Sequence, residues 1–172
     1  AHHFDTHSKE ILSQAFDELL SNADSCMTAS IPMNEYYKNK YKIRAFPVMP
    51  SLPALKSLSR KRLTPEEDRF RIIFTGQKYA NKELETFLEV LNEMNWKFKN
   101  KRIYMDVYSY NFDEKLSTKF PLLRQFGWTS QARLLQIISK ADLCYCPYPF
   151  SLDMKEVCQY SFPSKLTSYL YA

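Results

Sequence analysis

Apolar residues between positions 11 and 20 recur at three- and four-residue intervals, which predicts a helix over residues 8–20. Ser8 is expected to cap its first turn. Residues 24–30 are compatible with a short strand, and Pro32 suits the first turn of a second helix that extends over residues 33–41. Residues 47–65 carry four prolines and few large apolar residues, so we expect an irregular linker there.

From residue 69 onward, short apolar runs alternate with amphipathic segments. The expected strands are residues 70–75, 102–110, 122–126 and 142–148, and the expected helices are 81–94, 113–120, 130–141 and 163–172. Thr129 or Ser130 is positioned to cap the third of these helices. Strands that alternate with helices favour an α/β fold with a mostly parallel sheet and helices on both faces. The N-terminal 45 residues are expected to pack as a separate fragment, and the alternative is one compact domain in which they join the same sheet.

Length and composition narrow the class of protein. The chain has 172 residues, of which 45% are hydrophobic and 15% aromatic, so collagen-like and disordered classes are excluded. Its apolar runs fall far short of the roughly 20 residues that a membrane-spanning helix needs. The first ten residues also lack the pattern of a signal peptide. We therefore expect a soluble, cytoplasmic protein, and we assign no chemistry to its three histidines.

Glycine and cysteine usage excludes several kinds of site. Only Gly76 and Gly127 occur, so neither a P-loop nor a dinucleotide fingerprint with several glycines is present. The four cysteines show no CxxC spacing. Cys144 and Cys146 alternate within an apolar run, as two residues on one face of a buried strand do. Buried thiols in a reducing compartment are favoured over zinc ligands or disulfides.

The formal net charge of +5 raises the question of nucleic-acid binding. Residues 1–65 hold nine basic against six acidic residues, and residues 66–172 hold fifteen against thirteen. Neither segment is strongly basic, and the tightest basic runs, at 60–62 and 97–102, adjoin the ends of expected elements. A nucleic-acid-binding module is therefore only an alternative, because a footprint on phosphates needs a coherent basic stripe.

Two strand-to-helix loops carry candidate chemistry. Ligands of open parallel sheets bind beyond the carboxyl ends of the strands. In one such loop Gly76 is followed by Lys78 and Lys82 at the start of a helix, where backbone amides and a lysine together suit a phosphate, although both lysines could simply be solvated. In another loop Ser164 is a candidate cap, and Lys165 lies in the first helical turn against the helix dipole. Two such loops suggest a diphosphate.

Four passages together resemble a known family. They are ADSCMTASIPMNEYYKNKYK, IIFTGQKYANK, FGWTSQARLLQIISKADLCYCPY and SFPSKLTSYLYA. Their order and spacing are similar to the nucleotide-sugar-binding half of retaining glycosyltransferases with the GT-B fold, known as family 4 or group 1. The resemblance implies that residues 1–46 are the end of the N-terminal domain, 47–65 an interdomain linker, and 66–172 a Rossmann-like C-terminal domain that stops before the family's closing elements.

The resemblance carries roles to the residues that match. Gly76 matches the glycine that lets the chain approach the donor diphosphate, and Lys82 matches a cation that contacts it. Gln77 stands where many members have arginine. Gly127 and Trp128 match a loop beside the nucleotide base, with a core position as the equal alternative for Trp128. The implied diphosphate-binding residues are Gly76, Lys78, Lys82, Ser164 and Lys165, and those near the donor sugar are Tyr160, Ser161 and Phe162.

The sequence also departs from the family. Members commonly have two glutamates with seven residues between them at the donor site, but alignment on SKLTSYL places Tyr160 and Ser168 there. Ser168 could bind a ribose hydroxyl, more weakly than a carboxylate would. Asp153 and Glu156 lie nearby and are expected to face solvent rather than substitute. The catalytic residues therefore stay unassigned.

The resemblance implies a function and its requirements. We expect transfer of a sugar, with retention, from a nucleotide diphosphate donor to a saccharide or a lipid-linked acceptor, as in cell-surface polysaccharide synthesis. No metal and no cofactor are implied, because lysines neutralise the diphosphate and no Asp-x-Asp motif occurs. A lipid-linked acceptor would bring the full-length protein to a membrane surface, and no nucleic-acid partner is expected. The isolated chain is expected to be inactive. The alternatives are a non-catalytic nucleotide-binding or assembly domain and a basic nucleic-acid-binding module.

Overall fold

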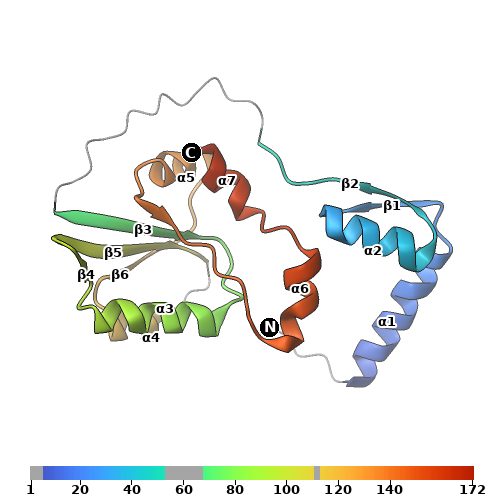
Figure 1. The fold of residues 1–172 in the computed structure, drawn as a ribbon, viewed down its shortest axis with the longest axis horizontal. Helices are drawn as coiled ribbons and strands as arrows, with labels where there is room; N and C mark the ends of the chain where they lie inside the picture. Colours follow the sequence, from blue (N-terminus) through green and yellow to red (C-terminus); the bar gives the residue numbers. More distant parts are fainter. Residues whose placement is uncertain (1–5, 53–67, 111–112) are drawn as a thin grey trace. The chain divides into compact units, whose positions relative to one another are not determined.

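The computed structural model describes residues 6–52, 68–110 and 113–172. The chain divides into two compact units, each of which is described by itself. The first unit comprises residues 1–50 and 156–162, and the second comprises residues 51–155 and 163–172 (Figure 1). The sequence analysis placed residues 156–162 in the second domain, whereas the structure groups them with the first unit.

The first unit contains a small β–α–β element. Its helices and strands are α1 (Thr6–Ser21), β1 (Ser25–Thr28), α2 (Ile31–Tyr41), β2 (Arg44–Pro47) and α6 (Lys155–Tyr160), which arrives from far along the chain. β1 and β2 pair in parallel, with Ser25 opposite Arg44, so α2 is the crossover between them. The helices expected over residues 8–20 and 33–41 and the strand at 24–30 are confirmed, whereas β2 and α6 were not expected.

Capping fixes the start of α2. The Ser30 side chain accepts a hydrogen bond from the Met33 amide at 3.1 Å, and Pro32 occupies the first turn as expected. At the other end Lys42 adopts a left-handed backbone, and its amide donates to the carbonyl of Lys38. The expected cap of α1 is wrong, because α1 begins at Thr6 and Ser8 lies inside it.

The second unit is an α/β layer structure. Its strands are β3 (Arg69–Thr75), β4 (Lys97–Phe98), β5 (Lys101–Tyr108), β6 (Leu123–Phe126) and β7 (Leu143–Cys144). Its helices are α3 (Asn81–Glu93), α4 (Glu114–Lys119), α5 (Gln131–Ile138) and α7 (Lys165–Tyr171), with a short 3-10 turn, η1 (Leu152–Met154), after β7. Every element expected from residue 69 onward is present, with bounds shifted by a few residues; β4 and η1 were not expected.

The sheet is open and mostly parallel. β5 pairs in parallel with β3 on one side and with β6 on the other, and β3 also pairs in parallel with β7. Among the strands that the structure describes in this sheet, only β4, at the start of β5, is antiparallel. The parallel strands therefore follow the order β6–β5–β3–β7. The chain runs from β3 to β5 and then to β6 on one side, and it then returns to form β7 on the other side of β3. This is the order of a doubly wound sheet, with its switch point between β3 and β7.

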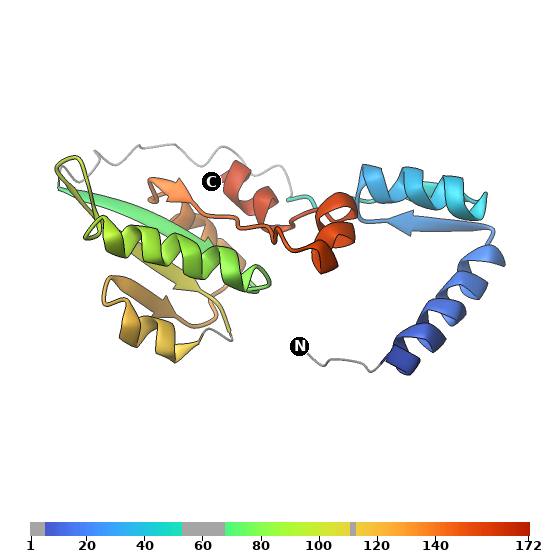
Figure 2. The same cartoon turned by 60° about the horizontal axis from the view of Figure 1, so that its bottom comes forward.

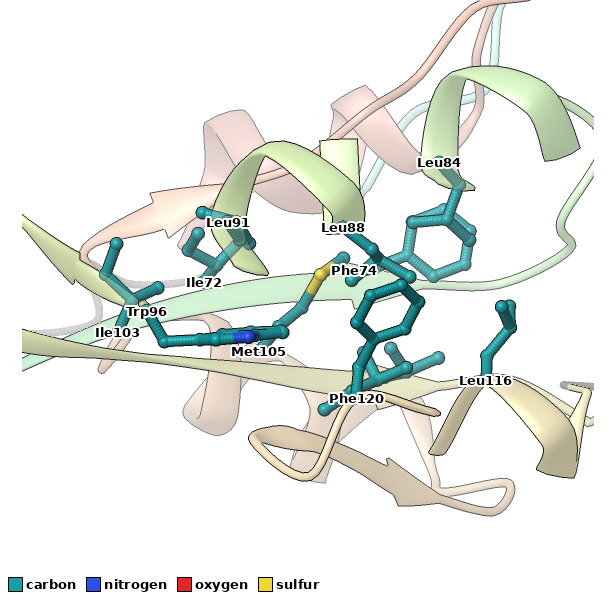
Figure 3. Packing of buried hydrophobic residues seen from close by; sticks show 12 residues of the cluster. Ile72, Phe74, Leu84, Leu88, Leu91, Trp96, Ile103, Met105, Leu116 and Phe120 are labelled. Carbon is teal, nitrogen blue, oxygen red and sulfur yellow. The ribbon is translucent and has the colours of Figure 1, made fainter. Parts of the chain in front are cut away.

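One face of the sheet holds the main hydrophobic core. Alternate residues of β3 and β5, such as Phe74 and Met105, point to this face and are fully buried. Leu84, Leu88 and Leu91 of α3 recur at helical spacing and pack onto them (Figure 3). α4 extends the same layer beneath the β5–β6 side (Figures 1 and 2). A continuous core of this kind keeps the carboxyl ends of β3 and β5 fixed.

The other face is covered by α5 and α7 (Figures 1 and 2). Ser130 caps α5 as expected, by accepting from the amide of Arg133 at 3.4 Å. Further along this face, the buried carboxylate of Asp106 accepts from Nε of Arg124 at 2.6 Å and lies 3.7 Å from Nε of Arg71. The structure confirms the fold class expected from sequence as a mixed α/β protein with helices and an open, mostly parallel sheet.

The last strand is shorter than expected. Residues 142–148 were expected to be extended throughout, but β7 pairs with β3 only through Leu143 and Cys144. The next amide, of Tyr145, still donates to the carbonyl of Ile73 at 2.8 Å before the chain leaves the sheet. Cys144 and Cys146 are half-buried rather than buried, because no further strand covers this edge in the described part of the chain. All four cysteines are free thiols.

Candidate functional site at the carboxyl end of the sheet

β3 ends at the switch point in a turn that favours glycine. Thr75 is the last residue of the strand, and Gly76 follows with φ of +79°. Side chains rarely tolerate this backbone conformation. The Gly76 amide donates to the carbonyl of Tyr108 at 2.8 Å, so it joins the ends of β3 and β5. A Cβ on Gly76 would meet Cε of Lys165 at 4.0 Å, so the turn and that lysine are close neighbours.

Lys165 brings a cation to this turn. It is the first residue of α7, and its Nζ donates to the carbonyl of Gln77 at 3.1 Å. The same nitrogen lies 4.3 Å from the centroid of the Phe74 ring and 5.2 Å from that of Tyr79. Burial lowers the pKa of Lys165, and the neighbouring Cys146 thiol opposes this effect. A partly buried ammonium interacts more strongly with an anion than a fully solvated one does.

Tyr169 fixes α7 across the switch point. Its hydroxyl accepts from the amide of Thr75 at 3.0 Å and from the Thr75 hydroxyl at 3.2 Å. It also donates to the carbonyl of Tyr145 at 3.2 Å. Burial raises the pKa of Tyr169 to about 12, so the phenol keeps its proton at neutral pH and continues to donate. Because Lys165 and Tyr169 are one helical turn apart, this anchor also holds the ammonium in place.

The start of α3 offers backbone amides without a side-chain cap. Its N-cap is Ala80, which is buried and has no hydroxyl or carboxylate to accept from the first turn. Lys82 lies in that turn and is exposed, and Lys78 is half-buried in the preceding loop. Glu83, also in the first turn, is engaged elsewhere, because its carboxylate accepts from the amide of Phe150 at 2.7 Å. The turn therefore has donors and a cation available for an anion.

The loop between β6 and α5 is open. A Cβ added to Gly127 would meet nothing within 4 Å, and Trp128 is 74% exposed. The alternative that Trp128 is a core residue is therefore wrong. Gln131, at the start of α5, donates to the Ser168 hydroxyl at 3.0 Å, which ties α5 to α7. An exposed indole can stack on a planar ring.

Three predicted residues belong to the first unit. Tyr160, Ser161 and Phe162 follow directly from α6, within the segment that groups with residues 1–50. The Ser30 hydroxyl donates to the carbonyl of Tyr160, whose ring stacks on Tyr36 with centroids 4.7 Å apart. The structure therefore assigns these residues to a different unit from the other predicted site residues. Asp153 and Glu156 are exposed, in agreement with the expectation that they face solvent.

Two features of the site differ from the sequence analysis. Ser164 stands at the N-cap of α7 but makes no side-chain capping bond, so its expected role as a cap is wrong. Its backbone is helical, with φ of −52° and ψ of −27°, and a capping side chain needs an extended backbone. Tyr169 was not predicted. The four-residue spacing from Lys165 was the available signal, since it places both residues on one helix face.

The comparisons give no family assignment. No model of a known protein family matches the chain, and no curated protein sequence matches it. In the part of the chain that the structure describes, no helix is both long enough and apolar enough to cross a membrane. The same residues contain no cluster of three or more histidine, cysteine or acidic side chains that could hold a metal ion.

Proposed function

We propose that the chain binds a nucleotide diphosphate sugar at the switch point of its sheet and belongs to a GT-B glycosyltransferase that transfers the sugar with retention. The observation that carries the proposal is the Lys165 ammonium, which lies beside Gly76 at the carboxyl end of β3. Doubly wound sheets bind ligands at this point of their topology. A half-buried lysine at the start of a helix is unfavourable for the helix alone, because of the helix dipole, and is better explained by an anionic ligand.

The chemistry of transfer requires such a cation. The bond between the anomeric carbon and the diphosphate oxygen breaks, and its electron pair leaves with the diphosphate. Lys165, Lys82 and the uncapped amides of α3 are suited to stabilise that growing charge. The acceptor hydroxyl forms the new bond on the same face of the sugar, and its proton passes to the departing diphosphate oxygen. A metal ion is not required in this scheme, because the lysines supply the positive charge.

The nucleoside would lie toward the loop between β6 and α5. Trp128 offers an exposed aromatic face there, and Gly127 leaves space for a base. Stacking of a base on an aromatic side chain contributes roughly 1–3 kcal/mol. Ser168, already held by Gln131, is available for a ribose hydroxyl. These assignments divide the site into a diphosphate part and a nucleoside part that can be tested separately.

Binding of nucleotides tests the proposal. Uridine, guanosine, adenosine and thymidine diphosphates are titrated into the protein by calorimetry, together with the nucleosides themselves. We expect at least one diphosphate to bind, with Lys82→Ala weakening the diphosphate but not the nucleoside. Lys140→Ala, which removes an exposed lysine just before β7 at the amino end of the sheet, is the matched control and should change neither. If no diphosphate binds, or if Lys140→Ala weakens it as much, the proposal fails.

A non-catalytic nucleotide-binding role is the second candidate. It is favoured by the residues Tyr160 and Ser168, which stand where the family that the sequence resembles has glutamates. Neither residue supplies a carboxylate. Release of nucleoside diphosphate from a nucleotide sugar in the presence of acceptor saccharides separates the two roles. Binding without release at any acceptor would support the non-catalytic role.

A further inference from the structure

A cavity lined by described residues lies within the first unit. It has a volume of about 410 Å³ and is lined by side chains of α1, α2 and the segment at and after α6. This volume falls in the range of small-molecule sites. The aromatic residues of its lining are Phe16, Tyr36, Tyr37, Tyr41 and Tyr160. Neither the fold of the sheet nor the proposed nucleotide site requires so many rings here.

The rings form a connected wall. Tyr36 stacks on Tyr160 with centroids 4.7 Å apart, and Phe16 meets the edge of Tyr37 at 6.0 Å. Tyr37 in turn meets Tyr41 at 5.6 Å. Phe16 remains 44% exposed even though it lines the cavity. A wall of this kind gives a ligand a broad apolar surface whose geometry is fixed in advance.

Charged groups stand beside this wall. Asp17 accepts from Nζ of Lys40 at 2.9 Å and from the hydroxyl of Tyr41 at 2.5 Å. These bonds, with Lys40 first, lower the pKa of Asp17, so it is a carboxylate at neutral pH. Glu156 also lines the cavity and makes no ion pair within the described residues. Two carboxylates and one ammonium leave the lining with a net negative charge.

These charges select the class of ligand. A phosphate or other anion is disfavoured by the excess carboxylate. A cation is disfavoured at the rings, because the Lys40 ammonium already lies 5.8 Å from the Tyr36 centroid and 4.8 Å from that of Tyr41. A purely apolar ring would displace water from Glu156 and from the Asp17–Lys40 pair. It could not replace the hydrogen bonds that these groups make to that water. A neutral ring with hydroxyls on its edge satisfies both parts of the lining.

We propose that this cavity binds one ring of a neutral saccharide. The C–H face of the sugar lies on the aromatic wall at Phe16, and its hydroxyls bind Glu156 and the adjacent carboxylate and ammonium of Asp17 and Lys40. Adjacent hydroxyls suit this pair because one can donate to a carboxylate while the next accepts from an ammonium. The further step, that this sugar is the acceptor of the transfer, rests on the proposed function. The binding of a saccharide in the cavity does not rest on it.

Ligand-observed saturation-transfer NMR on the full chain tests the inference. The probes are methyl α- and β-glucopyranoside, methyl α-mannopyranoside, maltose and cellobiose, and the comparison ligands are indole, adenosine and choline. We expect a saccharide to bind and one C–H face of its ring to receive the most saturation. If no saccharide binds, the inference is wrong, whether or not indole, adenosine or choline binds.

Substitutions locate the binding. Phe16→Ala should weaken the saccharide roughly 3- to 10-fold, because an aromatic contact is lost, while Phe16→Tyr retains it. Glu156→Gln should weaken it about threefold or more, through the loss of charge from a hydrogen bond. Leu19→Ala, on the same helix but outside the cavity, is the control and should have no effect. All three positions are accessible at the surface, so the four variants should fold, which circular dichroism checks. Saccharide binding that Phe16→Ala leaves unchanged would overturn the inference.

Nucleotide titration of the same samples keeps the two proposals apart. If a nucleoside diphosphate binds and no saccharide does, the inference about this cavity fails and the proposed function stands. If a saccharide binds and responds to Phe16→Ala but no diphosphate binds, the cavity is confirmed and the proposed function fails.

Discussion

Replacement of Lys165 by methionine separates the role of its charge from that of its carbon chain. Methionine keeps an unbranched apolar stem over the Phe74 ring but removes the ammonium that donates to the Gln77 carbonyl. A hydrogen bond to a charged group contributes about 1.5–3 kcal/mol, and each 1.4 kcal/mol is a factor of ten in affinity. Lys165→Met should therefore weaken a nucleoside diphosphate roughly 10- to 150-fold, while nucleoside binding is unchanged.

The stability of the variant should change little. The lost contact with the Phe74 ring contributes about 0.5–1 kcal/mol, and removal of a partly buried ammonium acts in the opposite direction. The free energy of unfolding should consequently differ from wild type by less than about 1 kcal/mol. Calorimetric titration and urea unfolding measure the two effects on one preparation, with Lys140→Met as the exposed control. A variant that loses stability and affinity together, or that keeps its affinity, would refute a role for Lys165 in binding the diphosphate.

The same residue predicts a pH dependence. Burial lowers the pKa of Lys165 in the folded state, so the unfolded chain holds the proton more strongly. Between the lowered pKa and the ordinary lysine value, the unfolded state binds more protons, and stability rises with pH across that window. Lys165→Met removes this contribution. Urea unfolding at a series of alkaline pH values should give a steeper rise for wild type than for the variant, and identical slopes would contradict the assignment.

Three further substitutions test the scaffold. Leu88→Ala, in the core of the second unit, should lower the free energy of unfolding by about 2–5 kcal/mol in chemical denaturation, and a change within error would show that α3 does not pack as described. Tyr169→Phe leaves the amide of Thr75 without its partner and should lower the free energy of unfolding by about 1–3 kcal/mol. It should also weaken diphosphate binding, because α7 carries Lys165. A loss of stability with unchanged affinity would show that Tyr169 does not position the binding site. Gly76→Ala should cost about 1–2 kcal/mol from its left-handed backbone, and an unchanged melting temperature would contradict that turn.

The parts of the fold that follow local patterns could be predicted from sequence. α3 and β3 were expected within one residue of their observed bounds, because their apolar residues recur with clear helical and strand character. β2 was missed because only Ala45 of its four residues is buried and Pro47 ends it. The shortness of β7 could not be foreseen either, since the position at which a strand leaves a sheet depends on its neighbour rather than on its own residues.

The residues of the candidate site that could be predicted are those whose position within a helix or loop is informative by itself. Lys165 was singled out because a lysine in a first helical turn opposes the dipole, and the structure places it beside Gly76. Tyr169 was missed because its partners, Thr75 and Tyr145, come from two strands whose adjacency only the fold creates. The aromatic cavity of the first unit was missed for the same reason, since Tyr160 reaches Tyr36 from the far end of the chain.

A diphosphate bound at the switch point between β3 and β7 would be visible in a crystal structure of the protein with the nucleoside diphosphate that binds most tightly. We expect phosphate oxygens within hydrogen-bonding distance of Nζ of Lys165 and of the amides at the start of α3, with the base toward Trp128. A nucleotide bound elsewhere on the second unit, for example at the arginines around Asp106, would contradict this expectation.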